Sequence, residues 1–217
     1  MSLKGKIYTA LLSKHSKIKN KRFEKQLRSS LKNDNFSIIC SNCIGGIIYS
    51  RLGKKFLSPT INLWINQKDF LKLIQNLKSY MDKELVFVDD EKYDYPVGLL
   101  GDIKIYFNHS ENEDNAKADW EKRKTRINYD NLYIIMYDRD GITIDDIHLL
   151  KDVDCKNIII LTDKEYPHID YAKTINPNLN AEFGYQFLDI DKYEIRTFEK
   201  QWDFVDWLNS DKTNTNR

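Results

Sequence analysis

The sequence predicts a layered α/β fold with a partly parallel sheet. Three short, almost wholly apolar runs have the character of strands buried on both faces, at residues 36–40, 132–137 and 157–162. Segments of roughly 10 to 17 residues with helical periodicity alternate with them, as in a sheet packed between helices. The 217 residues are 41% hydrophobic and 12% aromatic. Such a chain buries the core of one large domain, or of two small subdomains that share a sheet.

Residues 1–35 form a basic arm. They contain ten Lys or Arg and two acidic residues, a net charge of +8, so that residues 36–217 total −7 and the whole chain +1. Apolar residues recur at spacings of mostly four from Ile7 to Leu31, which predicts an amphipathic helix, or two helices broken near residues 19–21. The arm either docks on the body with its lysines in water or rests on an anionic membrane surface. Aromatic residues hardly interleave with the basic ones, so we expect no nucleic-acid partner.

The remaining elements follow in order. Before residue 110 we expect a strand at 36–40, a helix at 47–52, a short strand at 62–65, a helix at 69–81, a strand at 85–88, and one half-buried strand that follows a Pro-containing turn within 95–109. After residue 110 we expect a helix at 111–127, a strand at 132–137, a helix at 143–150, a strand at 157–162 and a terminal helix at 198–209. The expected organisation is therefore a helical arm at 1–35, an α/β domain at 36–209 and a disordered tail at 210–217.

Composition excludes several classes of protein. No window approaches the roughly 18 to 20 consecutive apolar residues of a membrane span, and the N-terminus lacks the apolar core of a secretory signal. The three cysteines, Cys40, Cys43 and Cys155, are an odd number without an export signal, which argues against a disulfide framework. We therefore expect a cytoplasmic protein, with peripheral contact to the inner face of the membrane as the alternative for the arm.

The turn at 41–46 has the residues of a candidate active site. Asn42, Cys43, Gly45 and Gly46 lie between a predicted strand and a helix. The glycines would let backbone amides approach an anion at the helix N-terminus, where a thiol also favours the thiolate form needed for nucleophilic attack. The alternatives are that Cys43 is a small residue packed against the sheet, or that it forms a redox or metal-binding pair with Cys40.

Two further residues are catalytic candidates. His109 follows a predicted strand, where a general base can stand, and Asp102 lies seven residues earlier. A regular strand would place the two on opposite faces, so they need not cooperate. The alternative for His109 is a loop histidine without a catalytic role.

A basic helix face and the turn after it are candidate substrate-binding elements. On a helix, Trp120, Arg123 and Arg126 fall within about 120° of one another, and such a face can hold a phosphate or carboxylate. Arginines that pair with nearby acidic residues as structural clamps are the alternative. The candidate binding residues of this stretch are Trp120, Arg123, Arg126, Asn128, Asp130 and Asn131.

The turn after the strand at 132–137 is a candidate metal site. Asp138 and Asp140 flank Arg139. Two carboxylates at this spacing can share Mg²⁺ or Mn²⁺ that in turn holds the diphosphate of a sugar nucleotide, and Arg139 would contact the substrate. Ordinary turn chemistry of Asp before Gly is the alternative.

Several motifs between residues 36 and 209 together resemble a known family. In order, they are IICSNCIGGIIYSRLG followed by SPT, then YPVGLLGDIKIYFNH, W-x-x-R-x-x-RIN-x-DN, DRDG and FVDWLN. This combination resembles the bacterial DUF1919 proteins, which are associated with exopolysaccharide or capsular polysaccharide biosynthesis. The resemblance implies a Rossmann-like fold and a role in surface polysaccharide assembly. Ile44 stands where the family has Trp, which removes a possible stacking platform for a sugar or base.

Three functions remain open from the sequence. The first hypothesis is a glycosyl or phospho-sugar transferase that takes an activated, anionic donor and a glycan or lipid-linked acceptor. The second is an acyltransferase or hydrolase with Cys43 as nucleophile and His109 as base. The third is a non-catalytic glycan-binding or scaffold component.

Overall fold

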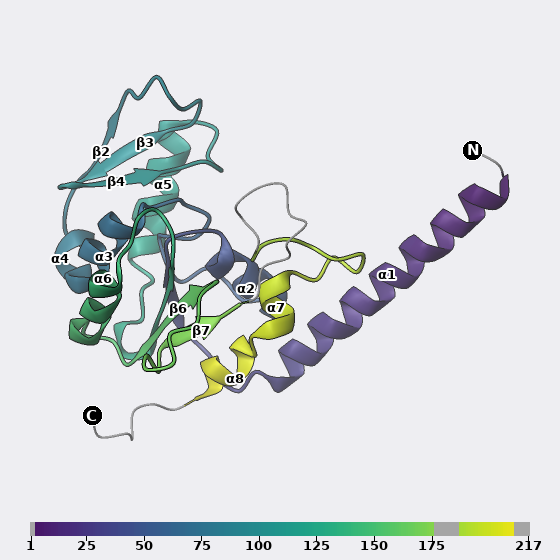
Figure 1. Ribbon diagram of the computed structural model, residues 1–217. Coiled ribbons are helices and arrows are strands. Elements are labelled where there is room, and N and C mark those ends of the chain that lie inside the picture. Colours follow the sequence, from purple (N-terminus) through teal and green to yellow (C-terminus); the bar gives the residue numbers. More distant parts are fainter. Residues whose placement is uncertain (1–2, 176–186, 211–217) are drawn as a thin grey trace. The chain divides into compact units, whose positions relative to one another are not determined.

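The computed structural model describes residues 3–175 and 187–210, with side chains from residue 13 onward (Figure 1). The described residues group into two compact units. The first comprises those of Met1–Asn33, Arg51–Gly53 and Ile175–Ser210, and the second those of Asp34–Ser50 and Lys54–Thr174. The tail expected to be disordered lies outside the described residues, apart from Ser210.

A parallel sheet forms the centre of the second unit. Its four strands, in spatial order, are β1 (Ser37–Cys40), β5 (Leu132–Tyr137), β6 (Asn157–Thr162) and β7 (Ala172–Thr174). The first three coincide with the predicted apolar runs. β7 was not predicted, because its three residues are all partly exposed and carry no apolar run. The arrangement confirms the expected Rossmann-like layered α/β fold with a partly parallel sheet.

A second sheet in the same unit is antiparallel. It consists of β2 (Leu85–Val88), β3 (Val97–Leu100) and β4 (Ile103–Tyr106), in that order. The prediction of one strand within 95–109 was wrong, because the chain reverses at Gly101, whose φ of 65° favours glycine. The strand predicted at 62–65 is only a single bridge between Trp64 and Tyr106.

The helices of the second unit differ in detail from those predicted. They are α2 (Ile44–Leu52), whose last two residues belong to the first unit, α3 (Gln67–Gln75), α4 (Leu77–Met81), α5 (Glu113–Lys124) and α6 (Ile144–His148), with short 3-10 turns η1 (Tyr129–Asn131) and η2 (Leu149–Asp152). One helix was predicted at 69–81, but Asn76 leaves the helical region at φ −135°, ψ 40° and separates α3 from α4.

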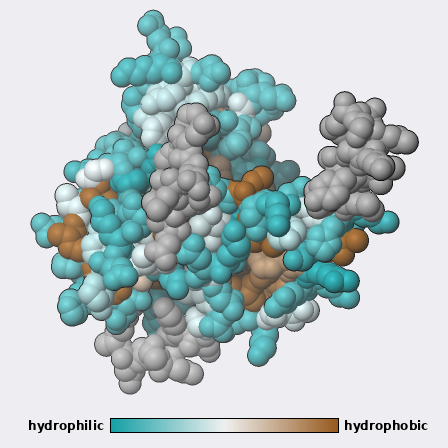
Figure 2. All heavy atoms as spheres, turned by 45° about the vertical axis from the view of Figure 1, so that its right-hand side comes forward, coloured by the Kyte–Doolittle hydropathy of each residue, from teal (hydrophilic) through white to brown (hydrophobic). Residues whose placement is uncertain are grey.

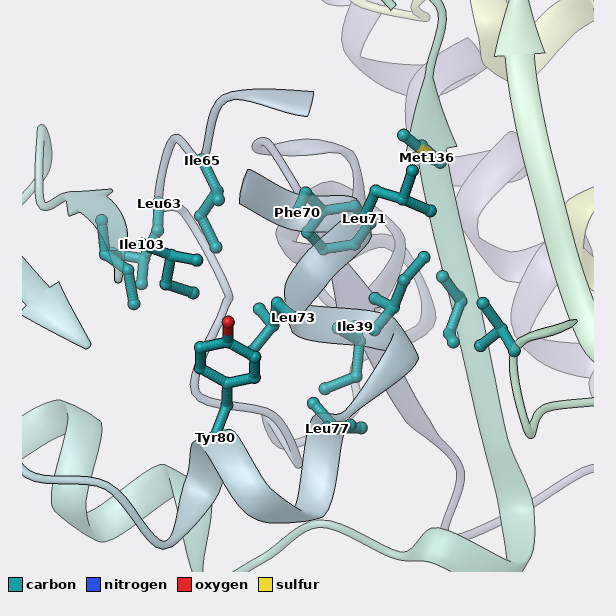
Figure 3. Close-up of a cluster of buried hydrophobic side chains, with 14 of the residues drawn as sticks. Ile39, Leu63, Ile65, Phe70, Leu71, Leu73, Leu77, Tyr80, Ile103 and Met136 are labelled. Carbon is teal, nitrogen blue, oxygen red and sulfur yellow. The ribbon is translucent and has the colours of Figure 1, made fainter. Parts of the chain in front are cut away.

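α2 and α3 pack on opposite faces of β1. A Cβ built on Gly45 of α2 would lie 3.1 Å from Cys40 Cβ and 3.3 Å from Ile38 Cγ2, so α2 packs closely on the face that carries these two residues. Ile39 points to the opposite face, as alternation along a strand requires, and joins the core built around α3. In Figure 3, Leu63, Ile65 and Ile103 lie on the left of this core and Met136 on the right, with Phe70, Leu73 and Ile39 in the middle.

The first unit is helical. α1 (Leu3–Ser30) is one continuous helix of 28 residues, without the break predicted as an alternative near residues 19–21. The helix predicted at 198–209 is two helices, α7 (Thr197–Gln201) and α8 (Phe204–Asn209). They are separated by Trp202, which has an extended backbone, and by Asp203, whose carboxylate accepts a hydrogen bond from the Asp206 N–H at 2.9 Å.

Arg51 holds the first unit together. Its guanidinium donates two hydrogen bonds to the Glu199 carboxylate, at 2.6 and 3.1 Å, and others to Asn20 Oδ1 at 2.6 Å, to Glu24 Oε1 at 3.1 Å and to the carbonyl of Glu194. These partners belong to α1, α7 and the segment before α7. Arg51 therefore fixes α1 against the C-terminal helices.

Along the described ranges, no helix has the length and apolar character that would let it cross a membrane.

Candidate functional site

The loop after β1 places Cys43 at the start of α2. The Cys43 carbonyl accepts the N–H of Ile47 at 3.0 Å, which begins the helix. Asn42 stabilises the turn, because its Oδ1 accepts hydrogen bonds from the Ile44 N–H at 2.9 Å and from Cys40 Sγ at 3.2 Å. Cys43 thus occupies the N-cap position, where unpaired helix N–H groups favour negative charge.

Gly45 and Gly46 are required by close packing. A Cβ on Gly46 would lie 2.1 Å from Asn62 Oδ1, closer than any ordinary contact. A Cβ on Gly45 would press on β1, as described above. Close packing therefore explains why glycine stands at both positions. The expected contact of these glycines with an anionic substrate stays a prediction.

The structure brings Cys43 and His109 together. Cys43 Sγ lies 3.3 Å from His109 Nε2, although 66 residues separate the two in the sequence. His109 lies in the turn after β4, closed by a hydrogen bond from the Ser110 N–H to the Phe107 carbonyl at 2.9 Å. His109 is exposed and Cys43 half-buried, so solutes can reach the pair. In the tautomer with the proton on Nδ1, Nε2 accepts the thiol proton.

Cys40 differs from Cys43 in environment. It is fully buried, and burial raises the pKa of its thiol to about 12. Cys40 therefore stays protonated and is not a nucleophile. In the ranges that the structure describes, no three His, Cys, Asp or Glu side chains are grouped so that they could hold a metal ion.

Buried polar residues support the Cys43 loop. Gln67, 1% exposed at the start of α3, donates to Ser41 Oγ at 3.0 Å and accepts the N–H of Tyr137 at 3.3 Å, so it links the carboxyl ends of β1 and β5. Thr60 Oγ1 accepts the N–H of Cys40 at 3.0 Å. Sequence reasoning missed Gln67 and Thr60 as site residues. The SPT motif could have pointed to Thr60 as a site residue.

Asp102 lies away from the Cys43–His109 pair. It precedes β4 whereas His109 follows it, and the strand alone extends over roughly 13 Å. Its carboxylate accepts hydrogen bonds from the Tyr80 hydroxyl at 2.6 Å and from Lys72 at 3.1 Å. These bonds lower the pKa of Asp102 to about 2. The structure thus gives Asp102 a role at the hairpin turn and no contact with the histidine.

The predicted basic face on α5 is not an open face. Trp120 is 1% exposed and lies in the core, with its ring 6.3 Å from that of Phe107. Arg123 donates to Asp119 at 2.6 Å, and Arg126, beyond the end of the helix, donates to the carbonyl of Phe56 at 3.3 Å. The competing interpretation, that the arginines are structural clamps, fits these contacts.

Asn128, Asp130 and Asn131 lie at the other edge of the parallel sheet. They precede β5, whereas Cys43 follows the carboxyl end of β1. Asn128 Oδ1 accepts the Asp130 N–H at 3.1 Å, its Nδ2 donates to the Asn35 carbonyl at 2.8 Å, and Asn131 Nδ2 donates to the Asp34 carbonyl at 3.0 Å. The amides fix the chain on entry to β1 and β5.

The turn after β5 lies at the same edge of the sheet as the Cys43 loop, because β1 and β5 run parallel. Asp138 Oδ2 accepts hydrogen bonds from the Thr162 hydroxyl and the Tyr166 hydroxyl, both at 3.0 Å. Arg139 Nε donates to Asp140 Oδ1 at 3.1 Å. One oxygen of each carboxylate thus has a protein partner, while Asp140 Oδ2 is buried without a hydrogen-bond partner among the described residues. A shared Mg²⁺ or Mn²⁺ at this turn stays a prediction.

Comparison with known proteins identifies the family. Residues 14–209 match the family described as a domain of unknown function, DUF1919. A protein of Haemophilus influenzae, described as uncharacterized, is 36% identical over 193 residues, which cover 88% of this chain and 93% of that protein. The matched region contains the Cys43 loop, the His109 turn and the C-terminal helices. The chain belongs to the DUF1919 family.

Proposed function

We propose that the protein is a cysteine-dependent enzyme that transfers or hydrolyses an acyl group. The observation that carries the proposal is the 3.3 Å distance between Cys43 Sγ and His109 Nε2. A nucleophile and base within hydrogen-bond reach are the signature of covalent catalysis. The N-cap position of Cys43 supports the same role, since the partial positive charge of a helix N-terminus favours a thiolate.

The reaction proceeds in two balanced steps. His109 Nε2 accepts the thiol proton while Sγ bonds to the carbonyl carbon, and the leaving group then departs with the proton from the imidazolium, which leaves a thioester on Cys43. A hydroxyl group or water next loses its proton to His109 and attacks the thioester carbon. The thiolate leaves and regains the proton, so enzyme and charge are restored.

The acceptor we propose is a hydroxyl group of a surface glycan, free or lipid-linked. This part rests on the role in surface polysaccharide assembly that the sequence resemblance implies. An activated acyl donor such as an acyl-coenzyme A would be anionic, as expected for the donor.

A metal-dependent glycosyl or phospho-sugar transferase, the first hypothesis from the sequence, has less support. It needs Asp138 and Asp140 to share a cation and Arg123 and Arg126 to contact a diphosphate. Each of these side chains has a protein partner instead.

The test is to trap the acyl-enzyme. The full chain is incubated with acetyl-coenzyme A or p-nitrophenyl acetate, with and without Mg²⁺, and the adduct is located by peptide mass spectrometry. We expect metal-independent acylation of Cys43, lost in Cys43→Ala and kept in the control Cys155→Ala. In His109→Gln we expect acylation to slow by about 100-fold or more, the usual contribution of a general base.

Other outcomes would reject the proposal. Equal labelling of Cys43 and Cys155, or an unchanged rate in His109→Gln, would mean that the pair is not catalytic. Stabilisation by a nucleotide sugar only with metal, lost in Asp138→Asn, would restore the first hypothesis. No adduct with any donor, together with binding of polysaccharide fragments, would favour the scaffold.

A further inference from the structure

We propose that α1 carries a cationic stripe by which the protein attaches to an anionic lipid surface. The cationic stripe consists of Lys14, Lys17, Lys21, Lys25 and Arg28, all exposed. This inference is independent of the chemistry at Cys43.

From residue 13 onward, the opposite face of α1 is occupied by the rest of its own unit. The Ser16 hydroxyl donates to the Lys192 carbonyl at 2.6 Å, and Asn20 Nδ2 donates to Glu194 Oε2 at 3.2 Å. Phe23 on this face is half-buried, and Arg51 stands over its ring at 5.9 Å. The apolar side of the described helix is therefore engaged, and the side that remains open is the charged one.

The stripe is narrow, long and of one sign. At about 100° and 1.5 Å per residue, its five cations lie within about 80° of arc and along about 21 Å of the helix. The four lysines have no acidic partner among the residues that the structure describes, whereas Arg28 contacts Glu24 at 3.5 Å. Glu24, at the border of the stripe, is drawn toward Arg51 at 3.1 Å. Free ammonium groups in a straight row match a flat surface of phosphate headgroups.

The chemistry favours a lipid surface over a nucleic acid. Lysine is a strongly hydrated point charge that responds to a diffuse negative potential, and no aromatic residue lies in the stripe for bases to stack on. Ile18, 42% exposed beside the stripe, adds an apolar contact at the interface. Residues 36–217 have a net charge of −7, so an anionic surface attracts the helix and repels the remainder of the chain. Hydrophilic side chains cover most of the face in Figure 2, and hydrophobic ones lie in separate groups.

The experiment measures sedimentation of the full chain with vesicles of phosphatidylcholine alone and of phosphatidylcholine mixed with phosphatidylglycerol. We expect binding to the mixed vesicles only, and loss of binding as salt is raised. Each lysine near the surface contributes about 1 kcal/mol, a factor of about five in affinity. The variant K14Q/K17Q/K21Q/K25Q should therefore bind at least about tenfold more weakly, since exposed lysines seldom act with full effect together.

A matched control removes the same number of positive charges from the second unit. K92Q/K117Q/K122Q/K151Q replaces four exposed lysines of the second unit and should bind like the wild type. Cys43→Ser should also bind normally, so that failure here and failure of the proposed enzyme are distinguishable. Circular dichroism checks that both quadruple variants keep their helices.

Four results would overturn the proposal. The first three are equal binding to neutral and anionic vesicles, equal losses in the two quadruple variants, and wild-type binding by the stripe variant. A fourth is displacement from mixed vesicles by duplex DNA at a lower phosphate concentration than the vesicles present, which would make nucleic acid the partner.

Discussion

Replacing Arg51 with Met should destabilise the first unit by about 3 to 5 kcal/mol, the usual consequence of leaving one buried charge without its partner. The Glu199 side chain is 0% exposed and that of Arg51 is 8%, so water cannot replace the lost guanidinium. The bonds of Arg51 to Asn20 and Glu24 add less, because Glu24 is about a third exposed and water can replace Arg51 there. For a chain of this size the loss lowers the melting temperature by about 6 to 20 °C.

The assay is urea unfolding followed by the fluorescence of Trp202 and Trp207, which lie in the same unit. A double-mutant cycle with Glu199→Gln isolates the pair, and we expect a coupling energy of at least about 2 kcal/mol, with the double variant more stable than Arg51→Met. Arg22→Met, on the exposed side of α1, is the control and should stay within about 0.5 kcal/mol of the wild type. A cost below about 1 kcal/mol for Arg51→Met, or additive single effects, would refute the reasoning.

Three further predictions follow from the second unit. Gly46→Ala should destabilise this unit by about 1 to 2 kcal/mol, because the new Cβ meets Asn62 Oδ1 and the better helix propensity of alanine offsets only part of the strain. Thermal melting measures the loss, and an unchanged or raised melting temperature would contradict the prediction. Gln67→Leu should cost about 2 kcal/mol in urea unfolding, since Ser41 and a backbone N–H lose their partner, and should change the alkylation rate of the loop thiol; a neutral result would mean that the loop does not need this support. Because the pKa of Asp102 is depressed to about 2 in the folded state, its carboxylate stabilises the fold above pH 3.8, and this stabilisation is lost as the pH falls toward 2. Asp102→Asn should therefore flatten the pH dependence of the free energy of unfolding between these values. An unchanged slope would refute this reasoning.

The main strands were predictable because each is a continuous apolar run bounded by polar turns. The hairpin of β3 and β4 was not, since Val97–Leu100 follows a proline and contains Gly98, and both features weaken a strand signal. The polarity of α5 fits its position at the surface. Because only Trp120 and Ala116 are buried on this helix, its polar composition gave no indication that Trp120 lies in the core.

The candidate site was predictable only in its parts. Position at strand ends pointed separately to Cys43 and His109, but their contact depends on the fold of the hairpin that carries the histidine. Gln67 precedes the helix predicted at 69–81 and has the sequence character of an exposed polar residue. Its burial results from the junction of β1 and β5, which local sequence does not encode. Local sequence likewise does not show that Arg126 and Asp102 lie away from the Cys43–His109 pair.

The environment of Cys40 limits the redox chemistry of the Cys40-x-x-Cys43 motif. Resolution of an oxidised cysteine requires a nearby thiolate, and Cys40, buried with a pKa of about 12, cannot supply one at neutral pH. A sulfenic acid formed on the accessible Cys43 would therefore persist until an external thiol reduces it, or proceed to the irreversible sulfinic acid. Oxidation of Cys43 is therefore not reversed by Cys40, and samples for any assay of Cys43 must be kept reduced from the first step of purification.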